Sequence, residues 1–120
     1  MTQKHQVRKY DLEERTAKFG EDIIELCQEI PKNEITRPII TQLIKCGTSI
    51  GANYSEADDA ESKLDFKHKI GICKKESREA KHFLRMLAKA DPSFIDKIRI
   101  SWQEVKELNL IFNSIFHKLK

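Results

Sequence analysis

Turn residues are scarce in this 120-residue chain, which contains four Gly and three Pro. An all-β sandwich needs a turn about every 8 to 12 residues, so this composition argues against that fold and favours long helices with few connections. The length predicts a single domain. No apolar run approaches the ~20 residues of a membrane span, and residues 1–10 are polar without a signal-peptide core. We therefore expect a cytoplasmic protein with no membrane partner.

Metal- and cofactor-binding patterns are also missing. The three Cys, at positions 27, 46 and 73, contain no CxxC pair, so we expect reduced thiols and no disulfide, zinc or redox site. A di-iron site in a bundle needs a Glu-x-x-His on each of two helices. Glu79 and His82 supply this spacing once, and Asp65 and His68 repeat it with Asp on the same helix. We predict no metal, no cofactor and no enzyme; a weak hydrolase using Glu76 and Glu79 is the remaining catalytic alternative.

Hydrophobic spacing predicts four amphipathic helices, because apolar residues recur three or four positions apart in four segments. The stripe residues are Leu12, Thr16, Phe19, Ile23, Leu26 and Ile30; Ile40, Leu43, Gly47, Ile50, Tyr54 and Ala57; Phe66, Ile70, Cys73, Ser77, Ala80, Leu84 and Leu87; and Ile98, Trp102, Val105, Asn109, Phe112, Phe116 and Leu119. Short turns between such helices predict an all-α, antiparallel up-down-up-down four-helix bundle over residues 11–120. Residues 1–10 have no stripe and are expected to form a mobile arm.

Local residues predict how the helices begin. Thr36 is expected to be the N-cap of the second helix, residues 37–57, while Ser62 and Asp91 are expected to cap the third and fourth. Gly47 and Gly51 lie inside the second helix, where each glycine costs about 1 kcal/mol relative to Ala. Their spacing of four therefore predicts a close approach of another helix.

A line of polar side chains runs beside the apolar stripe of the second helix. Its members are Gln42, Cys46, Ser49, Asn53 and Glu56. If the second and third helices are antiparallel, Ser49 should face Cys73, and Glu76 and Glu79 should lie near Lys45. Because a partly buried carboxylate needs a partner, we hypothesise that Lys45, Arg15 or polar groups of the second helix hold one of the two glutamates. The alternative is that these groups only fix the helix register.

The segment from Gln42 to Ala57, QLIKCGTSIGANYSEA, resembles the signature of the bacterial four-helix-bundle proteins first noticed as open reading frames in intervening sequences of 23S ribosomal RNA. Members are sometimes labelled S23 ribosomal protein. The motif positions present here are Arg15, Gln42, Lys45, Ser49, Asn53, Glu56, Glu76 and Glu79, and the resemblance covers residues 10–119. Ala80 and Phe83 depart from it, since Thr and Trp are common there.

The resemblance implies a four-helix protomer and, in several members, a ring-like homopentamer. A related branch is the accessory variability determinant of diversity-generating retroelements, which binds nucleic acid and a reverse transcriptase. RNA or DNA and a reverse transcriptase are therefore the partners that the resemblance implies.

Charge is unevenly distributed along the chain. Residues 1–60 carry 8 basic and 11 acidic side chains, whereas residues 61–120 carry 14 basic and 8 acidic ones. The second half contains a basic line along the third helix: Lys67, Lys74, Arg78, Lys81 and Arg85. Such a line can follow phosphates, although a solvated helix face is the alternative. No aromatic residues accompany the line, so we expect binding to the nucleic-acid backbone with weak sequence specificity.

The sequence contains more large apolar side chains than one apolar stripe per helix can accommodate. The surplus comprises Trp102, Leu108, Phe112, Ile115 and Phe116 on the fourth helix, Ile24 and Cys27 on the first, and Ile39 and Ile44 on the second. We expect some of them to be buried between protomers of a homo-oligomer. The sequence thus predicts an oligomeric, non-enzymatic, nucleic-acid-associated scaffold, with a protein-binding adaptor that has no affinity for nucleic acid as the alternative.

Overall fold

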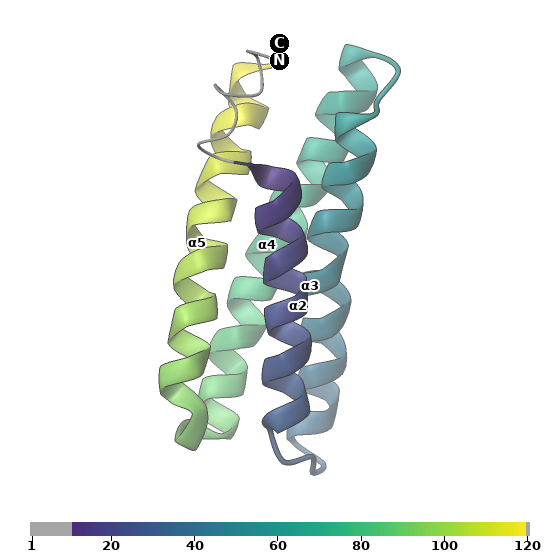
Figure 1. Ribbon diagram of the computed structural model, residues 1–120. Helices are drawn as coiled ribbons and strands as arrows, with labels where there is room; N and C mark the ends of the chain where they lie inside the picture. Colours follow the sequence, from purple (N-terminus) through teal and green to yellow (C-terminus); the bar gives the residue numbers. More distant parts are fainter. Residues whose placement is uncertain (1–10, 120) are drawn as a thin grey trace.

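Each apolar stripe of the sequence folds as one helix. The computed structural model describes residues 11–119, and its elements are α2 (Leu12–Glu29), α3 (Thr36–Asp58), α4 (Lys63–Ala90), the 3-10 turn η1 (Pro92–Phe94) and α5 (Ile95–Lys118). Over this part of the chain there is no strand, and successive helices run antiparallel (Figure 1), which confirms the all-α four-helix bundle. The predicted arm, residues 1–10, lies outside the described residues, as does Lys120.

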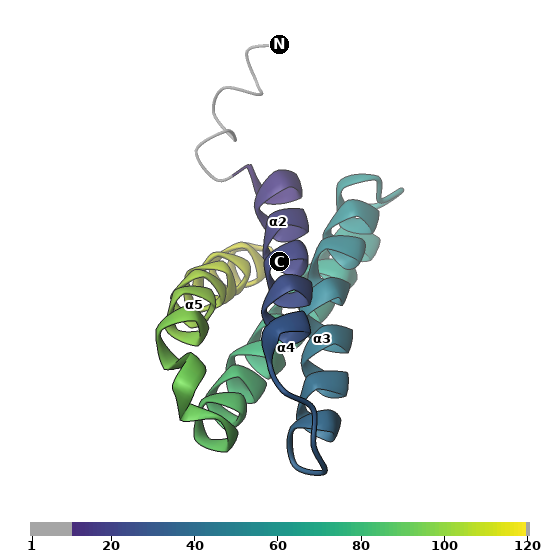
Figure 2. The same ribbon diagram turned by 60° about the horizontal axis from the view of Figure 1, so that its bottom comes forward.

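The core lies along the predicted stripes. The residues with at most 2% exposure include Phe19 and Ile23 of α2, Leu43 and Ile50 of α3, Ile70 and Leu84 of α4, and Val105 and Phe112 of α5. Viewed more nearly from one end (Figure 2), α3 and α4 run side by side and α2 packs on α3, whereas α2 and α5 have the smallest contact of the adjacent helix pairs. Between residues 11 and 119, no helix is both long and apolar enough to cross a membrane.

Part of the surplus apolar set is buried inside the protomer. Phe112 and Leu108 are fully buried, and Cys27 is only 2% exposed, so these three are not available to a second protomer. Their burial has a geometric reason: α5 packs against α4 and α2, and α2 packs against α3 and α5, and a helix between two neighbouring helices needs a wider apolar stripe. Trp102 and Phe116 remain half-buried, and Ile24 is 40% exposed.

Of the three predicted caps, Ser62 is confirmed at α4, whereas Asp91 caps the 3-10 turn η1 and α5 itself begins after Phe94 without a side-chain cap. The Ser62 hydroxyl accepts a hydrogen bond from the Asp65 amide at 3.0 Å, and the Asp91 carboxylate accepts one from the Ser93 amide at 3.3 Å. Thr36 as a cap is wrong. Its hydroxyl donates back to the Pro31 carbonyl, and the Asn33 side-chain oxygen instead accepts hydrogen bonds from the backbone amides of residues 35 and 36, each at 2.8 Å. The polar turn folds back on itself, which places Asn33 and not Thr36 beneath the free amides.

The two glycines of α3, Gly47 and Gly51, lie where α2 and α3 meet. A Cβ on Gly47 would lie 3.3 Å from the Ile23 side chain, and a Cβ on Gly51 would lie 3.3 Å from the Thr16 hydroxyl oxygen. Such distances are tighter than ordinary van der Waals contact. The expected close approach of a neighbouring helix is therefore confirmed, and the neighbour is α2.

Candidate nucleic-acid interface

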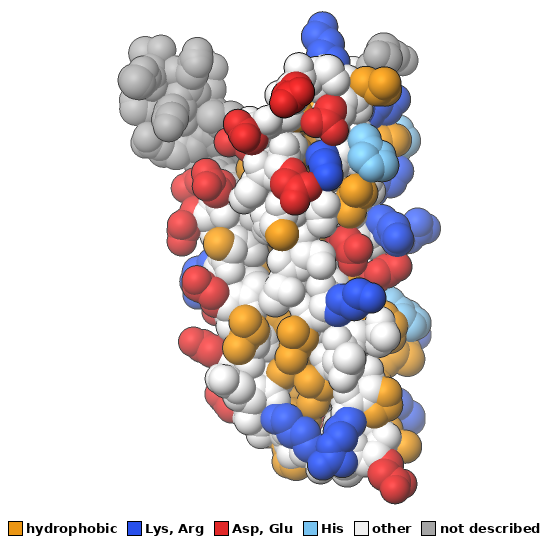
Figure 3. All heavy atoms as spheres, turned by 90° about the vertical axis from the view of Figure 1, so that its right-hand side faces the viewer, with side chains coloured by type: hydrophobic (Ala, Val, Ile, Leu, Met, Phe, Trp, Pro, Cys, Tyr) orange, Lys and Arg blue, Asp and Glu red, His pale blue; other side chains and the backbone are white. Residues whose placement is uncertain are grey.

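The bundle is electrically polarised from one edge to the other. Helix α2 carries two basic and six acidic side chains, a net charge of −4, whereas α4 carries nine basic and three acidic ones, a net charge of +6. Figure 3 shows Asp and Glu side chains along the edge formed by α2 and Lys, Arg and His side chains along the edge formed by α4. An approaching polyanion is attracted to the α4 side.

The predicted basic line lies on α4. Arg78 and Arg85 are exposed, while Lys67, Lys74 and Lys81 are half-buried. The line extends over about 27 Å at 1.5 Å per residue. None of its five cations forms a salt bridge with a carboxylate of residues 11–119, in contrast to Lys69, which pairs with Glu56 at 2.6 Å. The line therefore keeps its charge available to a ligand.

Aromatic rings from α5 lie against this line. The ammonium groups of Lys67 and Lys74 are 5.0 and 4.5 Å from the centre of the Phe116 ring. Those of Lys81 and Lys106 are 5.9 and 5.4 Å from the Trp102 ring. The expectation that aromatic residues are missing from the line was wrong, because it considered α4 alone and the rings come from the neighbouring helix. These distances are those of cation–π contacts.

Two hollows open along the seam between α4 and α5. The first, of about 380 Å³, is lined by Gly71, Lys74, Lys75, Arg78, Glu79 and Phe116. The second, of about 320 Å³, is lined by Leu84, Arg85, Ala88, Ile95, Ile98, Arg99, Trp102 and Gln103. Each hollow thus has one aromatic ring and at least two cations. We call this surface the basic face: Lys67, Lys74, Arg78, Lys81 and Arg85 of α4 with Arg99, Trp102, Lys106 and Phe116 of α5.

Small and polar residues position the α5 side chains on α4. A Cβ on Gly71 would lie 3.1 Å from the Phe116 ring, so a larger residue there would push the ring away from α4 by a few tenths of an ångström. The buried Asn109 amide donates to the Lys74 carbonyl and to the Ser77 hydroxyl, both at 2.9 Å. Asn109 sets the register of α5 at the middle of the basic face. From the sequence, Asn109 was predicted only as a member of an apolar stripe. Asn109 and Ser77 are polar residues on two otherwise apolar stripes, and this was the signal that the two side chains could pair.

The polar side chains of the α3 line hydrogen-bond mostly to backbone carbonyls of α3 itself, and one of them contacts α4. Ser49 donates to the Lys45 carbonyl at 2.6 Å, Asn53 donates to the Ser49 carbonyl at 2.9 Å, and Glu56 pairs with Lys69. Gln42, Lys45 and Glu56 are exposed. The predicted register is confirmed, since the Cys73 thiol lies 3.7 Å from the carbonyl oxygen of Ile50, next to Ser49. These contacts stabilise α3 and its pairing with α4.

Arg15 does not hold either glutamate of α4. Its guanidinium binds both oxygens of Glu104, at 2.8 and 3.0 Å, and one oxygen of Glu107 at 2.8 Å. Hydrogen bonding to Glu104 raises the pKa of Arg15. The assignment of Arg15 to Glu76 or Glu79 is wrong because Arg15 faces α5, on the side of α2 away from α3. It ties together α2 and α5, the adjacent helices with the smallest contact.

Glu76 and Glu79 lie half-buried beside Cys46. Burial raises the pKa of Glu76 above its ordinary value, the neighbouring charge of Glu79 raises it further, and the charges of Lys75 and Lys45 oppose the change. A side-chain hydrogen bond with Glu79 also contributes to the raised pKa of Glu76, and neither glutamate forms a salt bridge among the described residues. Lys45 therefore acts on Glu76 only at a distance, and the hypothesised contact with it is absent.

Replacing Glu76 by Gln is expected to raise the free energy of unfolding at pH 7 by up to about 0.5 kcal/mol, the scale of partly solvated charge effects. Because the folded-state pKa is raised, the wild type loses stability as the pH rises from the unfolded pKa, near 4.5, through the folded pKa. The extra stability of the Glu76→Gln variant should vanish at pH values below the unfolded pKa, where Glu76 is protonated in both states. Thermal melting between about pH 4 and pH 7 checks this, with the exposed Glu25→Gln as control. A less stable Glu76→Gln protein at pH 7 would contradict it.

The three cysteines are buried thiols. Burial raises the pKa of Cys27 to about 11 and those of Cys46 and Cys73 to about 12. A thiol with so high a pKa is a poor nucleophile and a poor metal ligand at neutral pH. Within residues 11–119 no group of three or more His, Cys, Asp or Glu side chains is arranged to hold a metal ion.

Comparison with known proteins gives two findings. Residues 8–114 match the family model described as 23S rRNA-intervening sequence protein. Among solved structures, the chain is similar to a protein of unknown function from the S23 ribosomal protein family of Bacteroides thetaiotaomicron, with 27% sequence identity and a TM-score of 0.77. The similarity covers 87% of this chain and 96% of that one. The search of curated proteins found no match.

Proposed function

This chain belongs to the 23S rRNA-intervening sequence protein family, and we propose that it acts as a non-catalytic scaffold that binds the phosphate backbone of RNA or DNA. One observation carries the proposal. The basic face places seven Lys and Arg side chains on two adjacent helices, and none of them pairs with a carboxylate of residues 11–119. One carboxylate, Glu79, lines the same surface.

The dimensions of the basic face suit a phosphate backbone. One strand of a duplex carries a phosphate every 3.4 Å along its axis, so a line of about 27 Å runs beside roughly eight phosphates. Each neutralised phosphate releases condensed counterions, which makes the affinity depend on salt. The acidic α2 lies at the opposite edge and favours approach from the α4 side (Figure 3).

A salt titration of binding tests this function. If five to seven phosphates are neutralised, a plot of log affinity against log salt concentration for duplex DNA should have a slope between about −4.5 and −6.3. A gel shift or fluorescence anisotropy with a labelled duplex measures it. Absence of binding at low salt, or binding that does not weaken with salt, would contradict the proposal.

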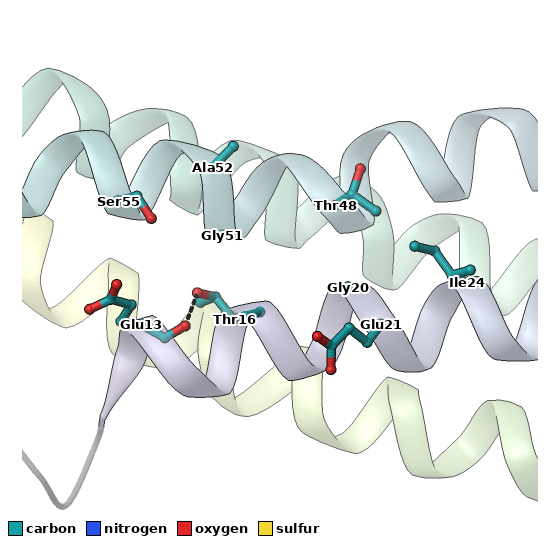
Figure 4. A pocket seen from close by; sticks show the side chains of 10 residues that line it. Glu13, Thr16, Gly20, Glu21, Ile24, Thr48, Gly51, Ala52 and Ser55 are labelled. Atoms are coloured by element: carbon teal, nitrogen blue, oxygen red, sulfur yellow. Dashed lines mark hydrogen bonds between the residues drawn. The ribbon is translucent and has the colours of Figure 1, made fainter.

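A second candidate function is protein–protein interaction through the groove between α2 and α3 (Figure 4). This groove, of about 330 Å³, is lined mainly by small side chains of both helices, with the exposed Ile24 at one end. Its charged lining residues are Glu13 and Glu21, which do not attract phosphate. An adaptor that uses this groove alone would show no salt-dependent binding of nucleic acid.

We also propose that the protomers assemble into a homo-oligomer, a pentamer by the resemblance described above. The exposed Ile24 in the α2–α3 groove and the half-buried Ile115, neither of which belongs to the basic face, support the proposal. A ring would repeat the basic face and raise the affinity for a long nucleic acid through multivalency. Sedimentation velocity is the test, and a stable monomer at micromolar concentration would contradict it.

A further inference from the structure

We infer that the basic face takes single-stranded nucleic acid, with bases stacked on Trp102 and Phe116. The inference rests on the proposed function and goes beyond it by naming the class of ligand. Backbone binding needs only the cations, and duplexes and single strands both supply phosphates. The two rings are the additional feature, because base–aromatic stacking requires a base whose face is accessible.

Both rings occupy positions from which a base is within reach. Each is half-buried, so part of its surface faces solvent, and each borders one of the two hollows on the seam between α4 and α5. The hollow beside Trp102 has an apolar floor of Leu84, Ala88 and Ile98, with Arg85 and Arg99 among its other lining residues. An apolar surface next to cations matches the chemistry of a nucleotide, whose base is flat and whose phosphate is charged.

The lysines next to the rings bring the phosphates of a stacked nucleotide close to positive charge. The ammonium groups of Lys67 and Lys74 lie over the Phe116 ring and those of Lys81 and Lys106 over the Trp102 ring, all within 6 Å of the ring centres. A stacked base takes the place of an ammonium group over the ring, and the flexible lysine side chain moves to the phosphate. When a base stacks on either ring, two ammonium groups are therefore within reach of the phosphates of the same nucleotide. The arrangement occurs twice on one face, which a chance contact of one ring with one lysine would not produce.

The separation of the rings sets the length of strand that reaches both. Trp102 and Phe116 are fourteen residues apart on α5, which corresponds to about 21 Å. That distance equals roughly six steps of a strand stacked at 3.4 Å per nucleotide. In a duplex the base faces are already stacked on one another, so the rings have no base to receive. A strand of about twelve nucleotides can occupy both rings, whereas one of three cannot.

Intrinsic fluorescence provides a direct test, because Trp102 is the only tryptophan in the sequence. Titration with a twelve-nucleotide oligothymidylate should quench this fluorescence, since a stacked base contacts the indole. A twelve-base-pair duplex should bind through the cations with little quenching. The affinity of each ligand is measured separately by anisotropy of a labelled strand.

Variants of the two rings complete the experiment. Trp102→Leu and Phe116→Leu should each weaken binding of the single strand roughly 5- to 150-fold, the cost of one lost stacked base, which is a larger loss than for the duplex because the duplex binds through the cations. Trp102→Phe, which keeps a ring, should retain most of the affinity even if Trp102→Leu folds poorly. Phe83→Leu is the matched control, because Phe83 is a half-buried aromatic residue of α4 that lines neither hollow.

The possible outcomes separate the two proposals. Quenching by the single strand together with a selective loss in the ring variants supports stacking. Salt-dependent binding without quenching, or equal losses for single strand and duplex, overturns stacking and leaves backbone binding intact. Failure of the wild-type protein to bind either ligand at low salt overturns both.

Discussion

The affinity for duplex DNA is expected to fall about 500-fold at 0.1 M salt when three charges of the basic face are reversed together, by Lys74→Glu, Arg78→Glu and Lys81→Glu. This loss of affinity follows from counterion release. Each phosphate contact makes the affinity vary with about the −0.9 power of the salt concentration, so losing three contacts at 0.1 M costs a factor of about 10 to the power 2.7. The salt slope should fall by about 2.7 at the same time.

The structure offers a control with the same change of net charge. Lys18, Arg37 and Lys97 are exposed and lie outside the basic face, and Lys18 and Lys97 pair with Asp22 and Glu29, respectively. Their combined change to Glu removes the same six units of charge with the same residue types. Because exposed ion pairs are worth about 0 to 1 kcal/mol, the control protein should fold.

The comparison of the two triple variants locates the site. If binding depends on the α4–α5 surface, the control should lose far less affinity than the basic-face variant, and its salt slope should stay close to that of the wild type. Equal losses in the two proteins would mean that only net charge matters. Circular dichroism and thermal melting establish that both variants are folded.

Replacing Phe112 by Ala is expected to lower the free energy of unfolding by about 3 to 5 kcal/mol, the usual cost of truncating a buried aromatic residue. Phe112 is fully buried, and its ring centre lies 6.2 Å from that of Tyr54, so α3 and α5 meet at this ring. Truncation removes apolar burial and leaves a cavity in a close-packed core. Since small domains are stable by only about 5 to 15 kcal/mol, this change is a large part of the total.

Phe116→Ala is the matched control for this prediction. Phe116 lies one helical turn further along α5 but is half-buried against α4, so its truncation should cost about half as much or less. Urea denaturation of the two variants measures the difference. If Phe112 were an interface residue, its loss would change the oligomeric state and leave protomer packing unchanged. A Phe112→Ala protein as stable as the wild type would contradict its place in the core.

Much of the fold could be predicted from local spacing. An apolar residue every third or fourth position defines a helical face whatever surrounds it, and the stripes through Ile23, Ile50, Leu84 and Val105 are buried as expected. Ser62 caps α4 as predicted, and Asp91 caps the 3-10 turn before α5, because a cap needs only backbone amides two or three residues away. The antiparallel register of Ser49 and Cys73 also followed, since a short turn leaves little choice.

The candidate site was only half predictable. The line from Lys67 to Arg85 is a property of one helix, and it lies on one face of α4 as predicted. Phe116 lies 42 positions after Lys74 and Trp102 lies 21 positions after Lys81, both on another helix. Periodicity within α4 could therefore not reveal that the two rings lie against its lysines. The same limitation hid the partners of Arg15, which are on α5.

The order of residues along this chain was enough to specify four helices, their apolar faces, most of their ends and the basic line, because those features depend on neighbours within one or two turns. Tertiary packing alone determined which helix covers each side of its neighbours. Rotation of each helix about its own axis, and the contact of α4 with α5 through Gly71 and Asn109, brought two aromatic rings beside the basic line. Packing of whole helix faces sets these rotations, so residues far apart in sequence meet without any local pattern that marks the pair.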